Sequence, residues 1–234
     1  MTEYAVDLGR GFSVLQDTEG YLFTQDSVIC ANLLPAGSRD RLLDLGCGTG
    51  VMSVLALLKK GVKEAVGVDV DPRAVSLAVR NAERCGLEKR MKVLCRDVRG
   101  IEKEVGRESF DKVVCNPPYF DFPDGTDGGR NASAKREGEA TLADFVAAAS
   151  ACLRFGGDFT LVMRAERLCD AMTTARAHAL EPKKLTLVFP RPDAKASVFV
   201  MTARKGGKPG VITDALYVVD ADGEQSERMK ELYG

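Results

Sequence analysis

The sequence predicts an α/β fold in which a mostly parallel sheet carries helices on both faces. Short apolar runs alternate with segments whose apolar residues recur at helical spacing, and this alternation is typical of such a sheet. A glycine cluster stands between one of these runs and the helical segment after it. With 234 residues, of which 45% are hydrophobic, the chain is long enough for one domain with a substantial core.

The strands are predicted from apolar runs bounded by turn residues. Residues 13–23 indicate a hairpin of two short strands around a Thr-Glu-Gly turn. Five later runs predict buried parallel strands, and two more predict a closing antiparallel hairpin. These seven runs are 41–45, 65–70, 91–95, 112–115, 159–163, 185–189 and 197–203.

Helices are predicted between the strands. Asp26 or Ser27 can cap a short helix before the first run, and residues 51–60 are helical after the glycine cluster. Asp71-Pro72 supplies a cap and a first-turn proline for the next helix. Apolar residues at positions i, i+3, i+4 and i+7 of that helix predict one core-facing stripe. The stripe consists of Val75, Ala78, Val79 and Ala82.

Two features mark the middle of the chain. Thr141 and Asp144 resemble a capping box that opens another helix. Residues 121–131 contain four glycines or prolines within eleven positions and fit neither the helical nor the strand period. We expect this stretch to be a mobile loop.

Composition excludes several classes of protein. Lys and Arg number 33 against 34 Asp and Glu, and the apolar content excludes a disordered chain. No apolar run approaches the ~20 residues that cross a bilayer, and the N-terminus lacks the basic and apolar pattern of a signal peptide. We therefore expect a cytoplasmic protein that does not bind membranes. Because the seven cysteines include no C-x-x-C pair and His178 is the only histidine, we expect neither a metal site nor a histidine-based triad.

The glycine cluster indicates the cofactor. The segment Asp44-Leu45-Gly46-Cys47-Gly48-Thr49-Gly50 follows a strand and precedes a helix, where glycines let the backbone approach a ligand closely. Val51 stands where a dinucleotide motif has its third glycine, and Asp44 suits a cationic ligand better than a phosphate. The candidate cofactor residues of this segment are Asp44, Gly46, Cys47, Gly48 and Gly50.

Aspartates at two further strand ends extend the candidate cofactor site. Asp69 ends the second strand of the sheet, close to the ~20-residue spacing at which a carboxylate binds ribose. Asp97 follows the third strand, where it can accept a hydrogen bond from an adenine amino group. Asp69 alone could be a helix cap, but the glycine cluster favours the binding role. Adenosine without phosphate, together with a positive tail, describes S-adenosylmethionine.

The segment Asn116-Pro117-Pro118-Tyr119 indicates the chemistry. It follows the fourth strand, at the edge where open α/β sheets bind ligands. The two prolines remove N–H donors, so the Asn116 side-chain carbonyl and the Pro117 backbone carbonyl form a corner that accepts both hydrogens of a planar NH2 group. Tyr119 offers a stacking face. Alone, the segment is also typical of a turn after a strand, but its place after the glycine cluster favours catalysis.

With these motifs the chain resembles the class I methyltransferases of the NPPY type, which act on adenine N6, cytosine N4 or glutamine N5. More narrowly, it resembles the bacterial tRNA1(Val) (adenine-37) N6-methyltransferase family over residues 14–205. Gln16, the segment Tyr21-Leu22-Phe23-Thr24-Gln25-Asp26-Ser27-Val28 and the cluster Lys135-Arg136-Glu137 carry this narrower resemblance.

The resemblance implies a Rossmann-like fold with a seven-stranded sheet that ends in an antiparallel hairpin. It implies S-adenosyl-L-methionine as cofactor and S-adenosyl-L-homocysteine as product, with the loop glycines against the methionine part. Asp69 would bind the ribose, and Asp97 with Val98 the adenine. Asn116, next to the cofactor, and Pro117 would polarise the target amine while Tyr119 stacks on the base. No metal is needed, because a sulfonium methyl is already an activated electrophile.

The resemblance also implies tRNA as partner, with an adenine of the anticodon-loop region as target. The net charge of −1 gives no overall attraction to RNA, but residues 183–208 hold seven Lys and Arg side chains against Asp193 alone. These residues can form a phosphate track or simply a solvated face. The candidate RNA-binding residues are Arg130, Lys135, Arg136, Lys183, Lys184, Arg191 and Lys195.

Three regions are expected. Residues 1–35 form an N-terminal β-hairpin and helix that pack on the core, 36–208 the S-adenosylmethionine-binding methyltransferase domain, and 209–234 an acidic C-terminal extension of the same domain. No obligatory protein partner is evident. The alternatives are a protein glutamine N5-methyltransferase of the release-factor type, for whose helical N-terminal domain residues 1–35 leave little room, a DNA adenine enzyme, or a non-catalytic Rossmann binding module.

Overall fold

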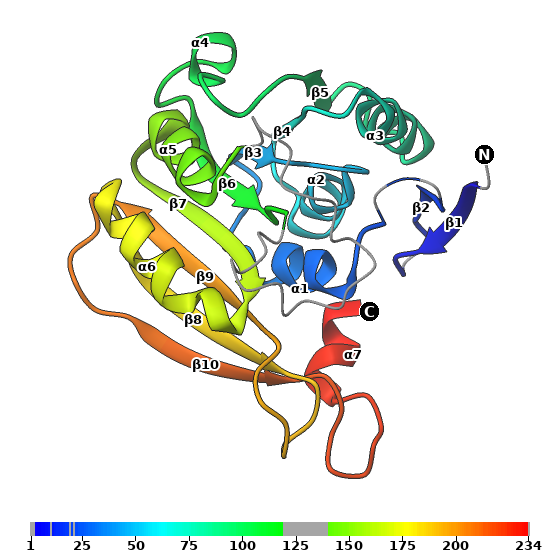
Figure 1. Cartoon of the computed structure of the whole chain (residues 1–234). Coiled ribbons are helices and arrows are strands. Elements are labelled where there is room, and N and C mark those ends of the chain that lie inside the picture. The colour runs from blue at the N-terminus through cyan, green and yellow to red at the C-terminus, as the bar shows by residue number, and fades with distance from the viewer. Residues whose placement is uncertain (1–2, 10, 19, 21, 119–139, 234) are drawn as a thin grey trace.

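Eight strands form one sheet with helices on both faces (Figure 1), in a computed structural model that describes residues 3–9, 11–18, 20, 22–118 and 140–233. The strand order is β10-β8-β9-β7-β6-β3-β4-β5. The strands of this sheet are β3 (Arg41–Leu45), β4 (Glu64–Asp69), β5 (Met91–Cys95), β6 (Phe110–Cys115), β7 (Leu153–Arg164), β8 (Leu180–Phe189), β9 (Val198–Lys205) and β10 (Ile212–Tyr217).

The helices connect these strands. They are α1 (Gln25–Leu33), α2 (Val51–Leu55) with its π-helical continuation (Ala56–Lys60), α3 (Pro72–Arg84), α4 (Glu102–Val105), α5 (Leu142–Cys152), a 3-10 turn (Ala165–Arg167), α6 (Leu168–Ala177) and α7 (Glu227–Tyr233). None of the helices in the described ranges combines the length and apolar character that a membrane span requires.

The predicted mostly parallel sheet with a closing antiparallel hairpin is confirmed. Strands β3 to β7 are parallel, and β9 lies antiparallel between β7 and β8. The expected number of seven strands is wrong, because β10 pairs in parallel with β8 and extends the sheet. Of its residues only Leu216 is buried, so this edge strand lacks the apolar run from which strands are predicted.

Two apolar cores lie on the two faces of the sheet. One joins α1, α2, α3 and α7 to one face, and the other joins α5 and α6 to the opposite face. Neighbouring strand residues point to opposite faces, so Leu42 belongs to the first core and Leu43 to the second. The capping box of Thr141 and Asp144 at the start of α5 is confirmed.

The N-terminal hairpin pairs differently from the prediction. Strand β2 (Ser13–Asp17) is antiparallel to β1 (Glu3–Asp7), and residues 22–24 form no strand. Because β1 is largely exposed, it lacks an apolar pattern. Asn81 of α3 fixes the hairpin: its Oδ1 accepts from the Leu15 N–H at 2.7 Å, and its Nδ2 donates to the carbonyls of Leu15 and Thr49.

This role of Asn81 also explains the error in the predicted stripe of α3. Ala78 and Ala82 are buried as expected, but Val75 is only partly buried and Val79 is exposed. The buried side is completed by Leu77 and Asn81. A polar side chain buried for its hydrogen bonds is invisible to a hydrophobic period.

The predicted cap of α1 is also wrong. Its N-cap residue is Thr24, so both Asp26 and Ser27 lie within the helix. At the start of α3, by contrast, the Asp71 carboxylate accepts a hydrogen bond from the Arg73 N–H at 2.8 Å, as the cap prediction requires. The loop predicted at 121–131 lies outside the described residues.

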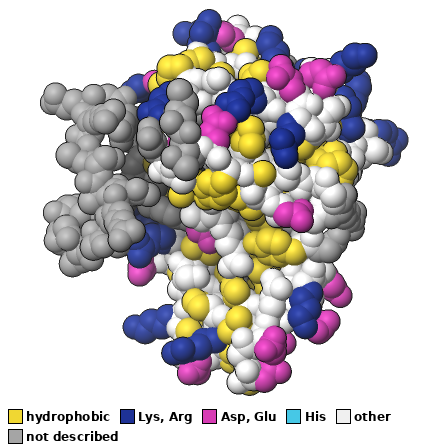
Figure 2. Space-filling model, turned by 90° about the vertical axis from the view of Figure 1, so that its right-hand side faces the viewer, with side chains coloured by type: hydrophobic (Ala, Val, Ile, Leu, Met, Phe, Trp, Pro, Cys, Tyr) yellow, Lys and Arg dark blue, Asp and Glu magenta, His cyan; other side chains and the backbone are white. Residues whose placement is uncertain are grey.

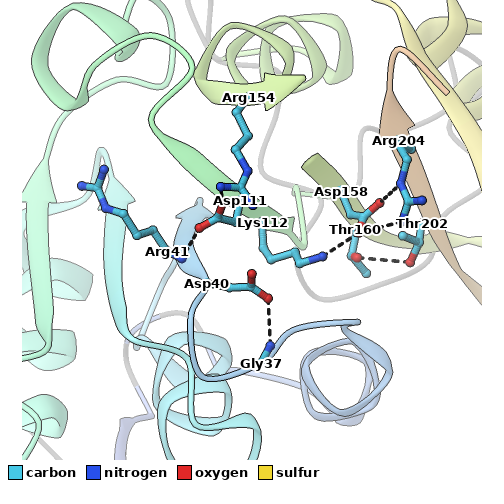
Figure 3. Close-up of polar contacts among 10 residues, drawn as sticks. All are labelled: Gly37, Asp40, Arg41, Asp111, Lys112, Arg154, Asp158, Thr160, Thr202 and Arg204. Carbon is cyan, nitrogen blue, oxygen red and sulfur yellow. Dashed lines mark hydrogen bonds and ion pairs between the residues drawn. The ribbon is translucent and has the colours of Figure 1, made fainter. Parts of the chain in front are cut away.

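A polar network closes the amino-terminal edge of the parallel strands (Figure 3). Asp158 of β7 binds Lys112 of β6 at 2.6 Å and Arg204 of β9 at 2.8 Å. Next to it, the Asp111 carboxylate accepts from the Arg41 N–H and pairs with Arg154. The cations of this edge are therefore engaged in holding neighbouring strands together.

Candidate functional site

The predicted site residues converge at the carboxyl-terminal edge of the sheet. Leu45 of β3 is level with Val68 of β4 and Cys115 of β6, and Asp69 is level with Cys95 of β5. The glycine cluster, Asp69, Asp97 and Asn116 therefore emerge from four neighbouring strands on one side. This is the edge at which open α/β sheets bind ligands.

The three loop glycines have left-handed backbone conformations. At Gly46 (φ +70°) a Cβ would lie 3.2 Å from the Phe145 ring, and at Gly50 (φ +78°) it would lie 3.1 Å from Cβ of Ala78 and 2.7 Å from Cε of Met91. Gly48 (φ +52°) donates its N–H to Asp69 Oδ2 at 2.8 Å. Close packing against α5 and α3 thus requires glycine at two of the three positions.

Cys47 holds the loop in shape with both its side chain and its backbone. A Cβ at Gly67 of β4 would lie 2.9 Å from Cys47 Sγ, so the thiol is turned under the loop towards the sheet. Its N–H donates to the Val68 carbonyl at 3.0 Å, and its carbonyl accepts from the Gly50 N–H at 2.8 Å. Burial raises the pKa of the Cys47 thiol well above its usual value, which keeps it neutral.

Four buried side-chain oxygens accept or donate no hydrogen bond to any residue in the described ranges, and we call them the open oxygens. They are Gln16 Oε1, Asp44 Oδ1, Thr49 Oγ1 and Asn116 Oδ1. Those of Asp44, Thr49 and Asn116 belong to the predicted glycine segment or the NPPY motif. That of Gln16 lies on β2, and Asn81 links β2 to the glycine segment by donating to the carbonyls of Leu15 and Thr49. Buried polar atoms without a partner are costly, so their concentration here indicates a ligand site.

Asp44 is the fully buried acid at this site. Its Oδ2 accepts from the Ser53 hydroxyl at 2.8 Å and from the Ser53 N–H at 3.1 Å, while Oδ1 is an open oxygen. Burial raises the pKa of Asp44 to about 7, against the lowering effect of the hydrogen bonds from Ser53. A buried carboxyl of this kind gains most from a cationic ligand.

Asp69 is oriented by the backbone around it. Oδ2 accepts from the Gly48 N–H at 2.8 Å and Oδ1 from the Asp71 N–H at 3.0 Å, which leaves further lone pairs on each oxygen. Burial raises the pKa of Asp69 above its usual value. The side chain is thus fixed as an acceptor for ligand hydroxyl groups.

Asp97 and Val98 are less open than their neighbours. Both Asp97 oxygens accept from the Arg99 guanidinium, at 2.5 to 3.1 Å, and these hydrogen bonds lower the pKa of Asp97. The Val98 side chain is buried in the second core. A ligand amino group would therefore share Asp97 with Arg99, and Val98 could meet a ligand only through its backbone.

Asn116 is the buried residue at the end of β6. Its Nδ2 donates to Ser27 Oγ of α1 at 2.9 Å, and its Oδ1 is an open oxygen. Pro117 is buried beside it and has no N–H to donate. The predicted acceptor corner therefore has one free side-chain acceptor in the structure. Tyr119 lies outside the described residues.

Sequence reasoning missed three residues of this site: Ser27, Thr49 and Val70. Ser27 was considered as a helix cap and as part of the segment 21–28 that carries the family resemblance, and Thr49 was named only within the glycine cluster. Val70 directly follows Asp69, and its side chain is 71% exposed. Such exposure is unusual for a branched apolar side chain and indicates a surface that a ligand covers. An acid followed by an aliphatic residue at a strand end is the signal that could have identified Val70.

The predicted RNA-binding residues of the described ranges lie in two different parts of the sheet. Arg191 and Lys195 are exposed in the loop between β8 and β9, beyond the register pair Val188 and Val198. Val198 is also level with Arg164 of β7. This loop therefore lies at the same edge as Asn116.

Lys183 and Lys184 lie in the first half of β8, where Lys184 is level with Thr202 of β9 and, through it, with Thr160 of β7. Lys183 Nζ donates to the carbonyls of Lys208 and Gly210, at 2.9 and 2.7 Å, and Lys184 is 3.9 Å from Asp214. Arg130, Lys135 and Arg136 lie outside the described residues. On the face that Figure 2 shows, Lys and Arg are interspersed with Asp and Glu.

The donor and acceptor set fits S-adenosylmethionine. Asp44 Oδ1 is suited to an ammonium group and Asp69 to ribose hydroxyls, both of which donate hydrogen bonds. Val70 offers an apolar surface beside them. Among the described residues, no group of three or more His, Cys, Asp or Glu side chains is arranged to hold a metal ion.

Comparisons with known proteins agree with this fit. Residues 25–179 match the family described as methyltransferase small domain. A tRNA1(Val) (adenine(37)-N6)-methyltransferase of Bacteroides fragilis is 27% identical over 79% of this chain and 78% of its own length. A protein of the same name from Shewanella sediminis is 23% identical over 91% of both chains. A ribosomal protein L11 methyltransferase of Lachnospira eligens is 37% identical over only 33% of this chain and 25% of its own.

Solved structures support the fold. A predicted O-methyltransferase from Agrobacterium tumefaciens superposes with a TM-score of 0.72 and 22% identity, over 89% of this chain and 95% of its own. The family match covers the glycine cluster, Asp69 and the NPPY motif together. The chain belongs to the methyltransferase small domain family and is an S-adenosylmethionine-dependent methyltransferase.

Proposed function

We propose that this enzyme methylates the exocyclic N6 amine of an adenine in the anticodon-loop region of tRNA. The observation that carries the proposal is the open Oδ1 of Asn116, a buried acceptor at the ligand-binding edge beside the Pro117 carbonyl. The names of the relatives that align with most of the chain support the choice of tRNA.

The chain's own residues have to prepare the amine for attack. The cofactor supplies a methyl group on a positive sulfur, which is already a good electrophile. The lone pair of an adenine N6 amine is delocalised into the ring. Hydrogen bonds from its two N–H groups to Asn116 Oδ1 and the Pro117 carbonyl would localise that lone pair and aim it, so catalysis is mainly alignment.

The target base must leave its stack to reach this corner, because an interior purine cannot enter a pocket at a sheet edge. A loop base is cheap to extract, since single-stranded RNA bases are already partly splayed. Tyr119 follows the corner in sequence, and we propose that its ring stacks on the extracted base.

The exposed Arg191 and Lys195 are proposed to contact RNA phosphates. Their loop lies at the edge of the sheet that carries Asn116, and within it Arg191 pairs with the exposed Asp193 at 2.9 Å. Lys183 and Lys184 are instead engaged with the segment around β10. Replacing Arg191 and Lys195 by alanine should weaken tRNA binding and reduce its salt dependence by about one unit of slope per lost phosphate contact. Lys183→Ala with Lys184→Ala, a control of equal charge, should leave both unchanged.

The proposed function is tested by methyl transfer. Labelled S-adenosylmethionine is incubated with the enzyme and total tRNA from a strain lacking the gene, and the nucleosides are then analysed. N6-methyladenosine in tRNA is the expected product. Labelled protein with unlabelled tRNA would refute the proposal in favour of a glutamine N5-methyltransferase. A protein substrate is the natural alternative, because part of the chain is similar to an enzyme named for a ribosomal protein, the L11 methyltransferase.

The role of Asn116 is tested separately. Asn116→Ala should abolish methyl transfer and leave cofactor binding, measured by calorimetry, within about twofold, because the lost carbonyl serves the target amine. Unchanged turnover would refute the proposed activation of the amine.

A further inference from the structure

The hydrogen bond between α1 and the NPPY segment joins two buried residues far apart in sequence. Asn116 Nδ2 donates to Ser27 Oγ at 2.9 Å, and both side chains are more than nine-tenths buried. Among the described residues, Ser27 is the hydrogen-bond partner of Asn116 Nδ2, and Asn116 Oδ1 is one of the open oxygens. One half of the amide is thus bound to the protein, and the other half is free for a ligand.

The orientation of this amide decides what it can do. A side-chain amide is nearly symmetric in shape but carries a donor on one side and an acceptor on the other. With the NH2 group directed to Ser27, the site presents an acceptor, which an amine substrate needs. Rotated by a half turn, the same side chain would present donors to the donors of the target amine and repel it.

Helix α1 is well placed to hold Ser27 still. Six consecutive residues of α1, from Ser27 to Asn32, are buried. Lys60 Nζ donates to the Asn32 carbonyl at 2.6 Å, and a side-chain hydrogen bond joins Gln25 to Tyr233. The serine hydroxyl therefore occupies a position that two other parts of the chain support.

We infer that Ser27 is a positioning residue, which holds the Asn116 side chain at the ligand edge with its carbonyl free for the target amine. A serine hydroxyl can accept from the NH2 group or donate to the carbonyl, so the target amine, which only the carbonyl can accept, selects between the two orientations. The inference rests on the proposed role of Asn116 and extends it to a residue from a different element of the fold. It holds whether the amine belongs to an adenine or to a glutamine, because both are planar NH2 groups.

The test compares Ser27→Ala with Ser27→Thr in single-turnover methyl transfer with saturating cofactor. Ser27→Ala should lower the rate about tenfold, the rate equivalent of one lost hydrogen bond, with cofactor affinity unchanged. Ser27→Thr keeps the hydroxyl but adds a methyl group at a buried position, so it should retain most of the rate. If Ser27 served packing alone, threonine would be the more harmful replacement, and that order would overturn the inference.

Asn32→Ala provides a matched control. Asn32 is buried in the same helix, and its Nδ2 donates to the Val28 carbonyl at 3.0 Å. The variant loses one hydrogen bond of α1 without touching Asn116, so its unfolding midpoint should fall while its transfer rate stays within about twofold. A loss of rate equal to that of Ser27→Ala would mean that any weakening of α1 has the same effect.

The outcomes separate this inference from the proposed function. If Asn116→Ala retains full turnover, the proposed role of Asn116 fails and the role of Ser27 fails with it. If Asn116→Ala abolishes turnover and Ser27→Ala does not lower the rate, the positioning role alone is refuted.

Discussion

The buried carboxylate of Asp158 allows a sharp prediction about stability (Figure 3). Its side chain is 2% exposed and pairs with Lys112, which is 15% exposed, and with Arg204, which is 50% exposed. Asp158→Ala removes the partner of both cations. Arg204 can turn to water, but Lys112 is left charged and almost dry. Removing one partner of a buried pair typically costs about 3–5 kcal/mol, so we expect about 3 kcal/mol.

Lys112→Met is the informative comparison. It leaves Asp158 with two hydrogen bonds from Arg204, at 2.8 and 3.2 Å, so the remaining charge is still paired. We expect it to cost about 1–2 kcal/mol, less than the cost of Asp158→Ala. Urea unfolding at pH 7 measures both free energies. Glu227→Ala, which removes an exposed ion pair with Lys230, serves as the control and should change the free energy of unfolding little. A cost below about 1 kcal/mol for Asp158→Ala, or a larger cost for Lys112→Met, would refute this reasoning.

Three more predictions concern the cofactor edge. Burial raises the pKa of Asp44 to about 7, so this carboxyl loses its proton at lower pH in the unfolded chain than in the folded one. The free energy of unfolding should therefore fall as pH rises from about 4 to about 7, and Asp44→Asn should make this fall shallower in urea titrations. Gly50→Ala should cost about 1–3 kcal/mol more than Gly61→Ala, because both need positive φ but only the first Cβ meets α3, as unfolding midpoints will show. Val70→Ser should weaken S-adenosylmethionine binding about tenfold by calorimetry, whereas Ile212→Ser, equally exposed on β10, should not.

Features carried by local pattern could be predicted from the sequence. The five parallel strands, the glycine cluster at a strand end and the capping box of α5 each depend on residues within a few positions of one another. The convergence of Asp69 and Asn116 at one edge then follows from the rule that parallel strands end together.

Features that depend on distant contacts could not be predicted. Ser27 meets Asn116 across 89 positions, and Asn81 is buried because of β2, so their roles appear only in the folded chain. Arg99, only two residues from Asp97, is different: its pairing with that acid was accessible to local reasoning, but the adenine role obscured it.

The helix α7 has a consequence for how the site is completed. Met229 is buried in the first core, and Lys59 Nζ donates to the carbonyls of Leu232 and Tyr233, both at 3.1 Å. Figure 1 shows α7 beside α1. A ribosome must therefore synthesise more than two hundred residues after Ser27 before the helix carrying it receives its last support. We expect the sheet to form early and catalytic competence to arrive late in the folding of each new molecule.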